Sequence, residues 1–416
     1  MIIIDAPGCN SYLLAKLSLM ETILNMPKVD FTNTEIAFAY KTDRELRWSN
    51  WLFRLMGISW LVNYGAKLAS WALKWRLPIG PIVKATIYKQ FCGGETIEES
   101  KAVIRRLQAS NIKTILDYGA EAKQTEADFE RTGQHLAETL EYAKTDKAIH
   151  IISTKLSGLF RRELMEKVTQ GLPLTDAETA EWQRGLDRVE RICRAAHEAG
   201  IGLHVDAEES WIQGAIDKIA WDMSIRYNKD KPTVINAVQL YRKDRLQFLK
   251  DSLDHARQHQ YLCAVKLVRG AYMEKERARA ANMGYPSPIH DTLEDTHRAY
   301  NEGLRFCLDH LGEIYVNNAT HNEESCRIQT ELMAERSIDP GNPLVVTAQL
   351  YGMSDNLSFN MAAAGYNVEK YMPYGPVREV LPYLIRRTRE NTSVGGQMSR
   401  ELRLIQTELQ RRKLGI

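Results

Sequence analysis

Residues 185–206 read GLDRVERICRAAHEAGIGLHVD, and this stretch holds one helix followed by one strand. In residues 185–200 apolar side chains recur at spacings of three and four, which predicts an amphipathic helix. Gly200 stands where a glycine commonly ends a helix. Residues 202–206 form a short apolar run that is typical of a buried strand. This pairing of helix and strand indicates the repeating unit of a parallel α/β fold.

The same alternation extends over most of the chain, with a second clear helical pattern at residues 244–260. Strand-like runs occur eight times, at residues 114–119, 150–155, 202–206, 233–241, 262–268, 314–320, 344–350 and 368–374. Eight strand–helix units predict a closed (β/α)8 barrel of the TIM type. We assign residues 91–416 to this barrel and residues 1–90 to an N-terminal helical segment.

Polar and charged residues gather where the predicted strands end. In a (β/α)8 barrel the carboxyl ends of the strands carry the active site. The residues at or just after these ends are Asp117, Glu121, Lys155, Asp206, Gln239, Lys266, Arg269, Thr320, His321, Asn322, Gln349, Lys370 and Tyr371. Acidic, basic and amide groups at most strand ends are better explained by a site than by a solvated rim.

A pair of arginines follows the last predicted strand. Residues 371–391 read YMPYGPVREVLPYLIRRTREN, which indicates a strand end, a turn and a helix that ends near Arg386 and Arg387. Two guanidinium groups at this place suit an anionic ligand. Alternatively, cations in the last turn of a helix offset its macrodipole.

Composition narrows the class of protein. The chain has 416 residues, an apolar fraction of 44%, a charged fraction of 26% and a formal net charge of +2. These values are those of a globular protein and give no case for nucleic-acid binding. Six cysteines are scattered without a CxxC pair, which is typical of reduced thiols in a cytosolic setting and not of a zinc finger.

The N-terminus gives no targeting signal. It has no positively charged opening and no long apolar run, and Asp5 together with the lack of arginine argues against a mitochondrial transit peptide. We therefore expect a cytoplasmic protein, peripheral to the inner membrane of a bacterium. Met1 and Met20 both stay open as the start of translation.

Residues 48–88 are rich in tryptophan and in basic residues. The uncharged run between Arg54 and Lys67 is too short to span a bilayer. A basic amphipathic helix with tryptophans can lie in the headgroup region of a membrane. Equally, the aromatic face can pack onto the main domain. We take residues 48–76 as the candidate for membrane contact.

Two common types of cofactor site are not supported, and a metal site is a weak alternative. No GxGxxG motif follows a strand, and no P-loop is present. His204, Asp206 and Glu208 alternate along a predicted strand and, with His321, offer metal ligands for a barrel hydrolase. Lys266 and Arg269 would crowd such a cation, so we expect no metal.

Several blocks of the sequence resemble one family. The segments KLVRGAYMEKERARAANMGYPSPIHDTLEDTH, ATHNEES and KYMPYGPVREVLPYLIRRTRENTS look like signature blocks of proline dehydrogenase. STKLSGL, LHVDAEESW and NAVQLYRKD match further blocks in the expected order, so the resemblance covers residues 90 to 410 and is closest to mitochondrial-type, monofunctional members. It implies an FAD-dependent (β/α)8 enzyme that oxidises L-proline to Δ1-pyrroline-5-carboxylate.

The resemblance also implies substrate contacts. Arg386 and Arg387 would bind the proline carboxylate, with Lys155 as a further cation. Tyr371 would pack against the proline ring, and Asp206 would organise flavin and substrate. Structural alternatives stay open: a barrel ion pair for Lys155, a core aromatic for Tyr371 and a turn cap for Asp206.

The cofactor contacts are implied in the same way. Lys266, taken with Asp206 as catalytic, and Arg269 would face the flavin. Bacterial members carry arginine and lysine in the opposite order, so which cation faces the isoalloxazine ring stays open. The other implied FAD contacts are Gln239, Gly270, Ala271, Thr320, His321 and Glu390. His321 can instead be a satisfied barrel histidine, and Glu121 is either a carboxylate gate over the site or an exposed residue.

Partners follow from the resemblance as well. A membrane quinone is the usual electron acceptor of the family. The nearest alternative is hydroxyproline dehydrogenase, in which a smaller residue typically replaces the tyrosine at the Tyr371 position. Tyr371 therefore favours proline. A barrel that has lost catalysis and serves as a membrane-bound scaffold is a further alternative.

Overall fold

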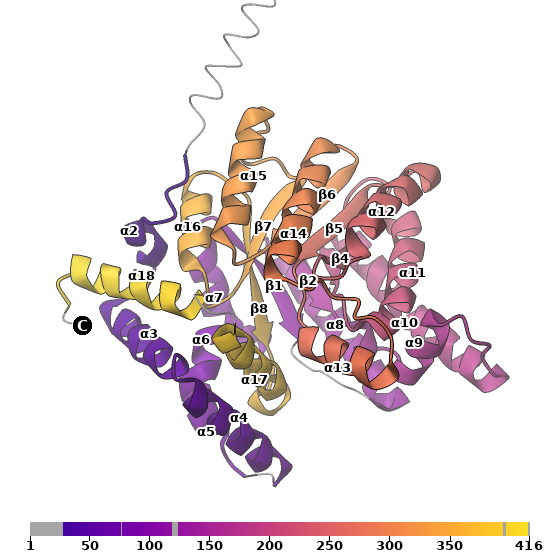
Figure 1. The fold of residues 1–416 in the computed structure, drawn as a ribbon, viewed down its shortest axis with the longest axis horizontal. Helices are drawn as coiled ribbons and strands as arrows, with labels where there is room; N and C mark the ends of the chain where they lie inside the picture. Colours follow the sequence, from indigo (N-terminus) through magenta and orange to yellow (C-terminus); the bar gives the residue numbers. More distant parts are fainter. Residues whose placement is uncertain (1–27, 76, 119–123, 394–396, 415–416) are drawn as a thin grey trace, which may run out of the picture.

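A closed barrel of eight parallel strands forms the centre of the protein. This computed structural model describes residues 28–75, 77–118, 124–393 and 397–414, and Figure 1 shows its strands surrounded by helices. The strands are β1 (Ile112–Tyr118), β2 (Ile149–Thr154), β3 (Gly202–Val205), β4 (Val234–Gln239), β5 (Cys263–Val268), β6 (Ile314–Ala319), β7 (Val345–Leu350) and β8 (Val368–Tyr374). They pair in chain order, and β8 pairs with β1 to close the barrel. The predicted (β/α)8 fold is confirmed.

Helices surround the barrel. They are α7 (Ile97–Gln108), α8 (Glu126–Thr145), α9 (Arg162–Thr169), α10 (Asp176–Ala199), α11 (Ser210–Tyr227), α12 (Arg245–His259), α13 (Met273–Met283), α14 (Leu293–Asp309), α15 (Glu323–Glu335), α16 (Asp355–Ala363), α17 (Val377–Ser393) and α18 (Gln397–Arg411). Gly200 ends α10 with a φ of 70°, as its position in the sequence predicts. The α10 helix starts at Asp176, well before the predicted residue 185, because Thr175 and Glu178 form a capping box.

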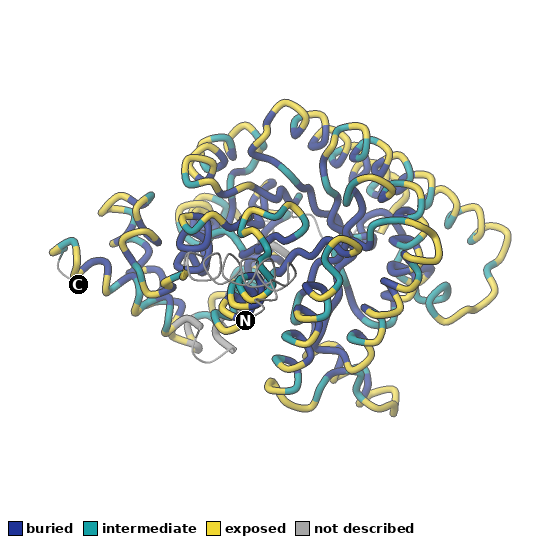
Figure 2. Tube along the Cα trace, turned by 90° about the horizontal axis from the view of Figure 1, so that it is seen from above, coloured by how far each residue is buried: buried dark blue, intermediate teal, exposed yellow. Residues whose placement is uncertain are grey.

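Alternate strand residues point to opposite faces. Outward residues pack against the helices in two large apolar clusters. A smaller cluster fills part of the barrel interior and contains Ile115, Ile151, Ile235, Ala264, Tyr315, Val346, Ala348 and Tyr371. Figure 2 shows the buried strands at the centre and the exposed outer sides of the helices. This pattern identifies which side chains face into the barrel.

Short and medium helices precede the barrel. They are α2 (Thr34–Phe38), α3 (Asp43–Met56), α4 (Ser59–Lys74), α5 (Gly80–Val83), η1 (Lys84–Tyr88) and α6 (Lys89–Phe91). Buried residues of α3, such as Leu46 and Phe53, share one apolar cluster with Leu381 and Leu384 of α17 and Leu409 of α18. The division of the chain at residue 90 stays a prediction.

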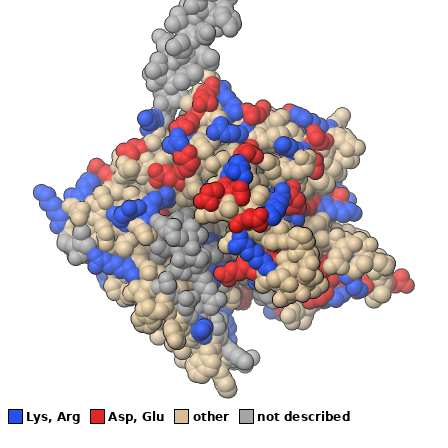
Figure 3. Space-filling model, viewed as in Figure 1, with Lys and Arg blue, Asp and Glu red and all other residues tan. Residues whose placement is uncertain are grey.

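The α4 helix leaves a row of large side chains in water. Trp60, Tyr64, Leu68, Trp71 and the following Trp75 are 52–69% exposed. Packing of these aromatic residues onto the main domain is therefore wrong, although Ala72 on the same helix is buried. Figure 3 shows a mainly uncharged surface where α4 and α5 project from the barrel. Among the described helices, none is both long and apolar enough to cross a membrane.

Candidate active site

Asp206 is the centre of a polar cluster at the carboxyl end of the barrel. Its Oδ1 lies 2.7 Å from Nζ of Lys266, and its Oδ2 accepts a hydrogen bond of 2.9 Å from the Tyr371 hydroxyl. Nζ of Lys155 lies 4.0 Å from the same Oδ2. Burial alone would raise the pKa of the Asp206 carboxyl, but the charges of Lys266 and Lys155 hold it below its ordinary value. The carboxylate is therefore ionised between two cations.

The sequence placed these four residues on four different strands, and the fold brings them together. Lys266 lies within β5 and Tyr371 within β8, while Lys155 and Asp206 directly follow β2 and β3. The Lys266 ammonium also lies over the Tyr371 ring, 4.8 Å from its centroid. Tyr371 is thus both a buried aromatic residue and a hydrogen-bond donor to Asp206.

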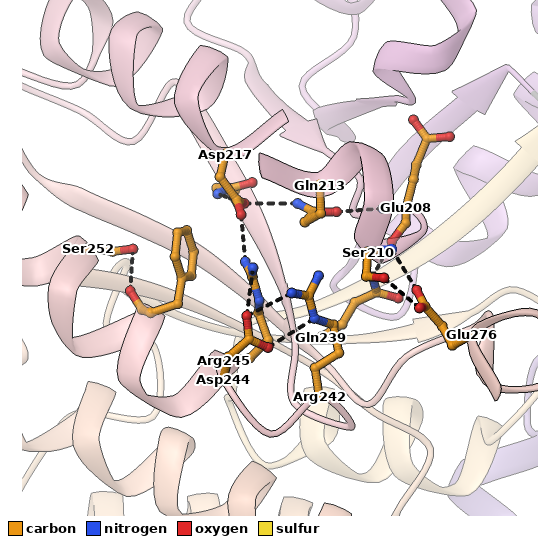
Figure 4. A network of polar contacts seen from close by, with 12 residues as sticks. Glu208, Ser210, Gln213, Asp217, Gln239, Arg242, Asp244, Arg245, Ser252 and Glu276 are labelled. Atoms are coloured by element: carbon orange, nitrogen blue, oxygen red, sulfur yellow. Dashed lines mark hydrogen bonds and ion pairs between the residues drawn. The ribbon is translucent and has the colours of Figure 1, made fainter. Parts of the chain in front are cut away.

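A hydrogen-bond network fixes the loop that carries Asp206 (Figure 4). Gln239 donates to the Glu208 carbonyl at 2.7 Å, and the Glu208 amide donates to Gln213 at 2.8 Å. Ser210 donates through its amide and its hydroxyl to Glu276, each at 2.6 Å. Gln239 therefore holds this loop in place, and its predicted contact with a cofactor stays a prediction.

Glu208 does not share a face with Asp206, contrary to the alternation expected from the sequence. The strand β3 ends at Val205, and the Glu208 carboxylate instead accepts hydrogen bonds from the amide and hydroxyl of Ser157. Within the described residues, no group of three histidine, cysteine or acidic side chains is arranged to hold a metal ion. The metal-hydrolase alternative is therefore not supported.

The arginine pair lies inside α17 and not in its last turn, because this helix continues to Ser393. This placement removes the macrodipole explanation. The Arg386 guanidinium lies 5.6 Å from the ring centroid of Tyr272, and that of Arg387 lies 5.5 Å from the ring of Tyr383. Burial raises the pKa of Tyr272, while the charges of Arg386 and Lys155 oppose the rise. Arg386 and Lys155 are thus both close to Tyr272.

Arg269 makes a different set of contacts from Lys266. Its guanidinium donates to Nδ1 of His297 at 2.8 Å, to the Thr320 hydroxyl at 2.6 Å and to the Ser325 hydroxyl at 2.9 Å. It also stacks over Tyr300 at 4.1 Å. Burial lowers the pKa of Arg269, and no carboxylate of the described chain forms an ion pair with it. A partly buried cation with only neutral partners suits an anionic ligand such as a phosphate.

Gly270 is required by local packing. Its φ is 138°, and a Cβ at this position would lie 2.4 Å from the Tyr241 ring. The neighbouring Ala271 amide lies 3.4 Å from Oε1 of Gln239. Close passage of residues 270 and 271 beside a cofactor stays a prediction.

Both ring nitrogens of His321 contact polar groups of the protein. Its Nδ1 lies 2.9 Å from the Ser354 hydroxyl, and its Nε2 accepts a hydrogen bond of 3.4 Å from the Leu350 amide. Burial lowers the pKa of His321 well below its ordinary value, and the charge of Arg387 lowers it further. These contacts fit a structural barrel histidine, and contact with a cofactor stays a prediction.

Two predicted site residues cannot be placed. Glu121, the proposed gate, and the side chain of Glu390 lie outside the described residues. Conversely, the geometry adds residues to which no role had been given. Tyr272 and Tyr383 contact the arginine pair, and Asp117 is buried beside Asp206. Tyr272 directly follows Gly270 and Ala271, and Tyr383 lies one helical turn before Arg387, which is the signal the sequence offered.

Comparisons with known proteins bear on the family of the chain. Residues 100–400 match the family described as proline dehydrogenase. "Proline dehydrogenase 1, mitochondrial" of Dictyostelium discoideum is 30% identical, with 93% of this chain and 76% of that protein covered. Hydroxyproline dehydrogenase of Xenopus laevis is 31% identical, with 90% and 88% covered.

A solved structure shares the fold. Proline utilization A from Bdellovibrio bacteriovorus superposes with a TM-score of 0.70 at 17% identity. The match covers 94% of this chain and 42% of that longer chain, so it bears on the barrel and not on the rest of the larger protein.

The expected bacterial location is wrong. The Dictyostelium relative and several others from eukaryotes are named mitochondrial proteins. Together, the match over residues 100–400 and the identity over most of both chains show that this chain belongs to the proline dehydrogenase family.

Proposed function

We propose that the protein oxidises L-proline to Δ1-pyrroline-5-carboxylate, with FAD as cofactor and a membrane quinone as electron acceptor. The observation that carries this proposal is the cluster of Lys155, Asp206, Lys266 and Tyr371 at the barrel's carboxyl end. The cluster combines cations with one shared carboxylate, which suits a small zwitterionic substrate.

The substrate carboxylate would bind to Arg386, Arg387 and Lys155. Guanidinium groups form forked, charge-assisted hydrogen bonds with carboxylates. Tyr272 and Tyr383 flank the arginines and restrict their motion. Fixing the carboxylate sets the position of the ring and hence the orientation of the carbon–hydrogen bond that breaks.

The ring and its nitrogen would lie toward Tyr371 and Asp206. The Tyr371 hydroxyl is already bonded to Asp206, so the aromatic ring presents an apolar surface to the substrate. The Asp206 carboxylate, held by Lys266, stabilises positive charge on the substrate nitrogen.

FAD would supply the hydride acceptor. The fit of the chain to this group rests on Arg269, whose neutral partners leave its charge available for a phosphate. Thr320 and Gln239 lie beside this region through their contacts with Arg269 and Ala271. Lys266, in contrast, is neutralised by Asp206 and would face the reactive end of the cofactor.

The proposal is tested by mixing the FAD-loaded protein anaerobically with L-proline, and separately with trans-4-hydroxy-L-proline. Faster loss of oxidised-flavin absorbance with proline is the expected result. A reconstituted protein that neither substrate reduces would overturn the proposal.

Hydroxyproline is the second candidate substrate because a hydroxyproline dehydrogenase matches 90% of the chain. Tyr371 opposes it, since its buried hydroxyl occupies space next to Asp206. Such a steric preference is worth a few kcal/mol at most, about 1–3. Preferential reduction by hydroxyproline would assign the protein to that activity and leave the roles of the arginines unchanged.

The row of exposed side chains on α4 would contact the membrane that supplies the quinone. Trp60, Tyr64, Leu68, Trp71 and Trp75 follow one another at three- and four-residue spacing and form one stripe. Tryptophan and tyrosine favour the membrane–water interface. Lys67, beside the stripe, is suited to anionic headgroups.

A further inference from the structure

The interior of the barrel is unusually polar below the Asp206 cluster. Barrels of this type are usually filled by branched apolar residues. Here Asp117, Ser153, His204, Asn317 and Glu369 also face inward, because their neighbours along each strand belong to the outer clusters. All five are buried. These residues lie beyond the part of the site that contacts substrate.

The polar residues follow one another down the barrel. Along β3, His204 is one inward position before Asp206, and along β8, Glu369 is one inward position before Tyr371. Across the strands, Asp117 pairs with Ser153, and Ser153 pairs with His204. Together they form a descending series from the site toward the amino ends of the strands.

The two ring nitrogens of His204, in the middle of this series, have no hydrogen-bond partner within the described chain. Buried polar atoms are costly unless they are hydrogen-bonded, and ordered water is the usual partner. His204 is 0% exposed, so such water would be internal.

Small residues line the same part of the interior. Ala237, Ala264, Ala319 and Ala348 face inward on four successive strands. A buried water needs space and two or more polar partners, and small side chains beside the ring nitrogens of His204 favour such a water.

The series reaches solvent at the opposite end of the barrel. Glu369 accepts a hydrogen bond of 3.1 Å from Asn317 and lies 2.9 Å from Nδ1 of His150. Glu369 is 1% exposed at its side chain, whereas His150 is 42% exposed. His150 therefore connects the buried carboxylate to bulk water.

We infer that Asp117, Ser153, His204, Glu369 and His150, with internal water, form a proton path from the active site to the amino-terminal end of the barrel. The inference rests on the proposed oxidation of proline. Burial lowers the pKa of His204 well below its ordinary value, and Lys266 lowers it further, while Asp206 opposes them and His150 adds a small repulsion. A neutral imidazole has one donor and one acceptor, which suits a relay.

The reaction releases a proton, for which this path would be an exit. Oxidation of the proline zwitterion removes a hydride from the ring carbon beside nitrogen and one proton from the ammonium nitrogen, and leaves a protonated carbon–nitrogen double bond. Bound FAD would accept the hydride. The nitrogen–hydrogen bond must break before or with this step, and the proton passes through water to His204 and then toward Glu369 and His150.

The test is anaerobic rapid mixing of holoenzyme with L-proline, with flavin absorbance and a pH-indicator dye followed together. His204→Leu should slow both signals at least tenfold at neutral pH. The rate should recover near the pKa of proline's own ammonium group, where no proton needs to be carried. His204→Gln, which keeps a donor and an acceptor, should be slowed less, and Ile235→Val is the control for altered packing.

The outcomes separate the two proposals. A wild-type holoenzyme that proline does not reduce would overturn the proposed function itself. If proline reduces the wild type, and folded, flavin-loaded His204→Leu gives wild-type rates at every pH, the path is wrong. Should His204→Leu not fold, Glu369→Gln and His150→Leu replace it. At least threefold slowing is expected for each, and unchanged rates in both overturn the path.

A second readout does not depend on turnover. A high-resolution crystal structure of the holoenzyme should show ordered waters bonded to His204 and to the Ser153 hydroxyl. An interior without water at these atoms would contradict the path.

Discussion

The barrel mouth and the α4 helix each place side chains in an unfavourable environment, but of opposite kinds. At the barrel mouth, the charged side chains of Asp206 and Lys266 are only 13% and 8% exposed, and each compensates the other. On α4, Trp60 and Trp71 are apolar and exposed, and no described part of the chain covers them. Burying charge costs several kcal/mol per ion, about 20 in the idealised limit, before pairing offsets it. Apolar surface that stays in water lacks the favourable free energy of burial, about 25 cal/mol per Å².

The difference indicates which kind of binding partner suits each region. The charges at the barrel mouth are fixed by hydrogen bonds before any ligand binds, as a precise small-molecule site requires. The α4 stripe has no such geometry and suits a partner that needs only an apolar boundary, such as a bilayer. Substitutions at the barrel mouth should therefore change catalysis or ligand binding, and substitutions on α4 should change binding to membranes.

The largest effect is expected for Asp206→Ala. It leaves Lys266 buried without its carboxylate, which should cost about 3–5 kcal/mol of stability. It also removes the group that orders the site, so kcat/KM for proline should fall about 100-fold or more. Urea unfolding and steady-state kinetics measure both. Asp254→Ala, at an exposed ion pair, is the control and should change stability by less than about 1 kcal/mol.

The next effect is expected for Arg387→Met. Loss of one charge-assisted contact with the carboxylate should raise KM for proline about 10- to 100-fold. Flavin content should not change, because the arginine is assigned to substrate. The exposed Arg298→Met is the matched control. Unchanged proline kinetics in Arg387→Met would show that the carboxylate binds elsewhere.

Arg269→Met should have the converse effect. It removes a cation assigned to a phosphate, so FAD affinity should fall about 10-fold or more, as flavin fluorescence on dilution will report. The KM for proline, measured with saturating FAD, should stay within about twofold. Equal FAD affinity in wild type and variant would remove the phosphate assignment. Arg327→Met on the surface of α15 controls for loss of charge.

A smaller effect is expected on the pH dependence of stability. Because the folded-state pKa of Asp206 is lowered, its ionised form stabilises the protein above the unfolded-state pKa of about 3.9. This contribution to the free energy of unfolding is lost as the pH falls through the lower folded-state pKa of Asp206. The difference in unfolding free energy between wild type and Asp206→Asn should be constant near neutral pH and shrink below about pH 4. A difference that does not change with pH would contradict the ion-pair assignment.

The smallest effect on catalysis is expected for α4. Replacing Trp60, Tyr64, Trp71 and Trp75 together by glutamine should reduce liposome binding at least about tenfold. Activity with a soluble acceptor should stay within about twofold, because these side chains face solvent and none of them is assigned to substrate or cofactor. Deleting residues 48–76 is a poorer test, since α3 contributes Phe53 to the apolar cluster that includes α17.

Two exposed apolar residues elsewhere provide the control for this substitution. Leu172→Gln with Met283→Gln removes exposed apolar side chains from other parts of the molecule and should leave liposome binding unchanged. Equal binding by wild type and the α4 variant would show that the stripe does not meet the membrane.

The fold was largely predictable because its signals are local. Apolar runs, helical spacing and Gly200 all lie within short windows of sequence. The errors were at boundaries. The α10 helix begins at Asp176 because of the Thr175–Glu178 capping box, a signal that is present in the sequence. Because the strand β3 ends before Asp206, the strand alternation does not continue to Glu208, whose carboxylate contacts Ser157.

The location of the site was predictable from the sequence, but many hydrogen-bond partners of its residues were not. Strand ends brought Asp206, Lys266 and Tyr371 together as expected. The partners of Arg269 were not predictable, because His297 and Ser325 come from helices whose orientation depends on packing over the whole barrel. The same holds for the unpartnered atoms of His204, which reflect the shape of the interior.

The proposed substrate site is best tested by a crystal structure with L-proline bound to holoenzyme whose flavin was reduced beforehand, so that the substrate is not consumed. We expect the proline carboxylate within hydrogen-bond distance of Arg386, Arg387 and Lys155, with the ring against Tyr371. Proline bound away from the arginines, or with its nitrogen toward them, would contradict it.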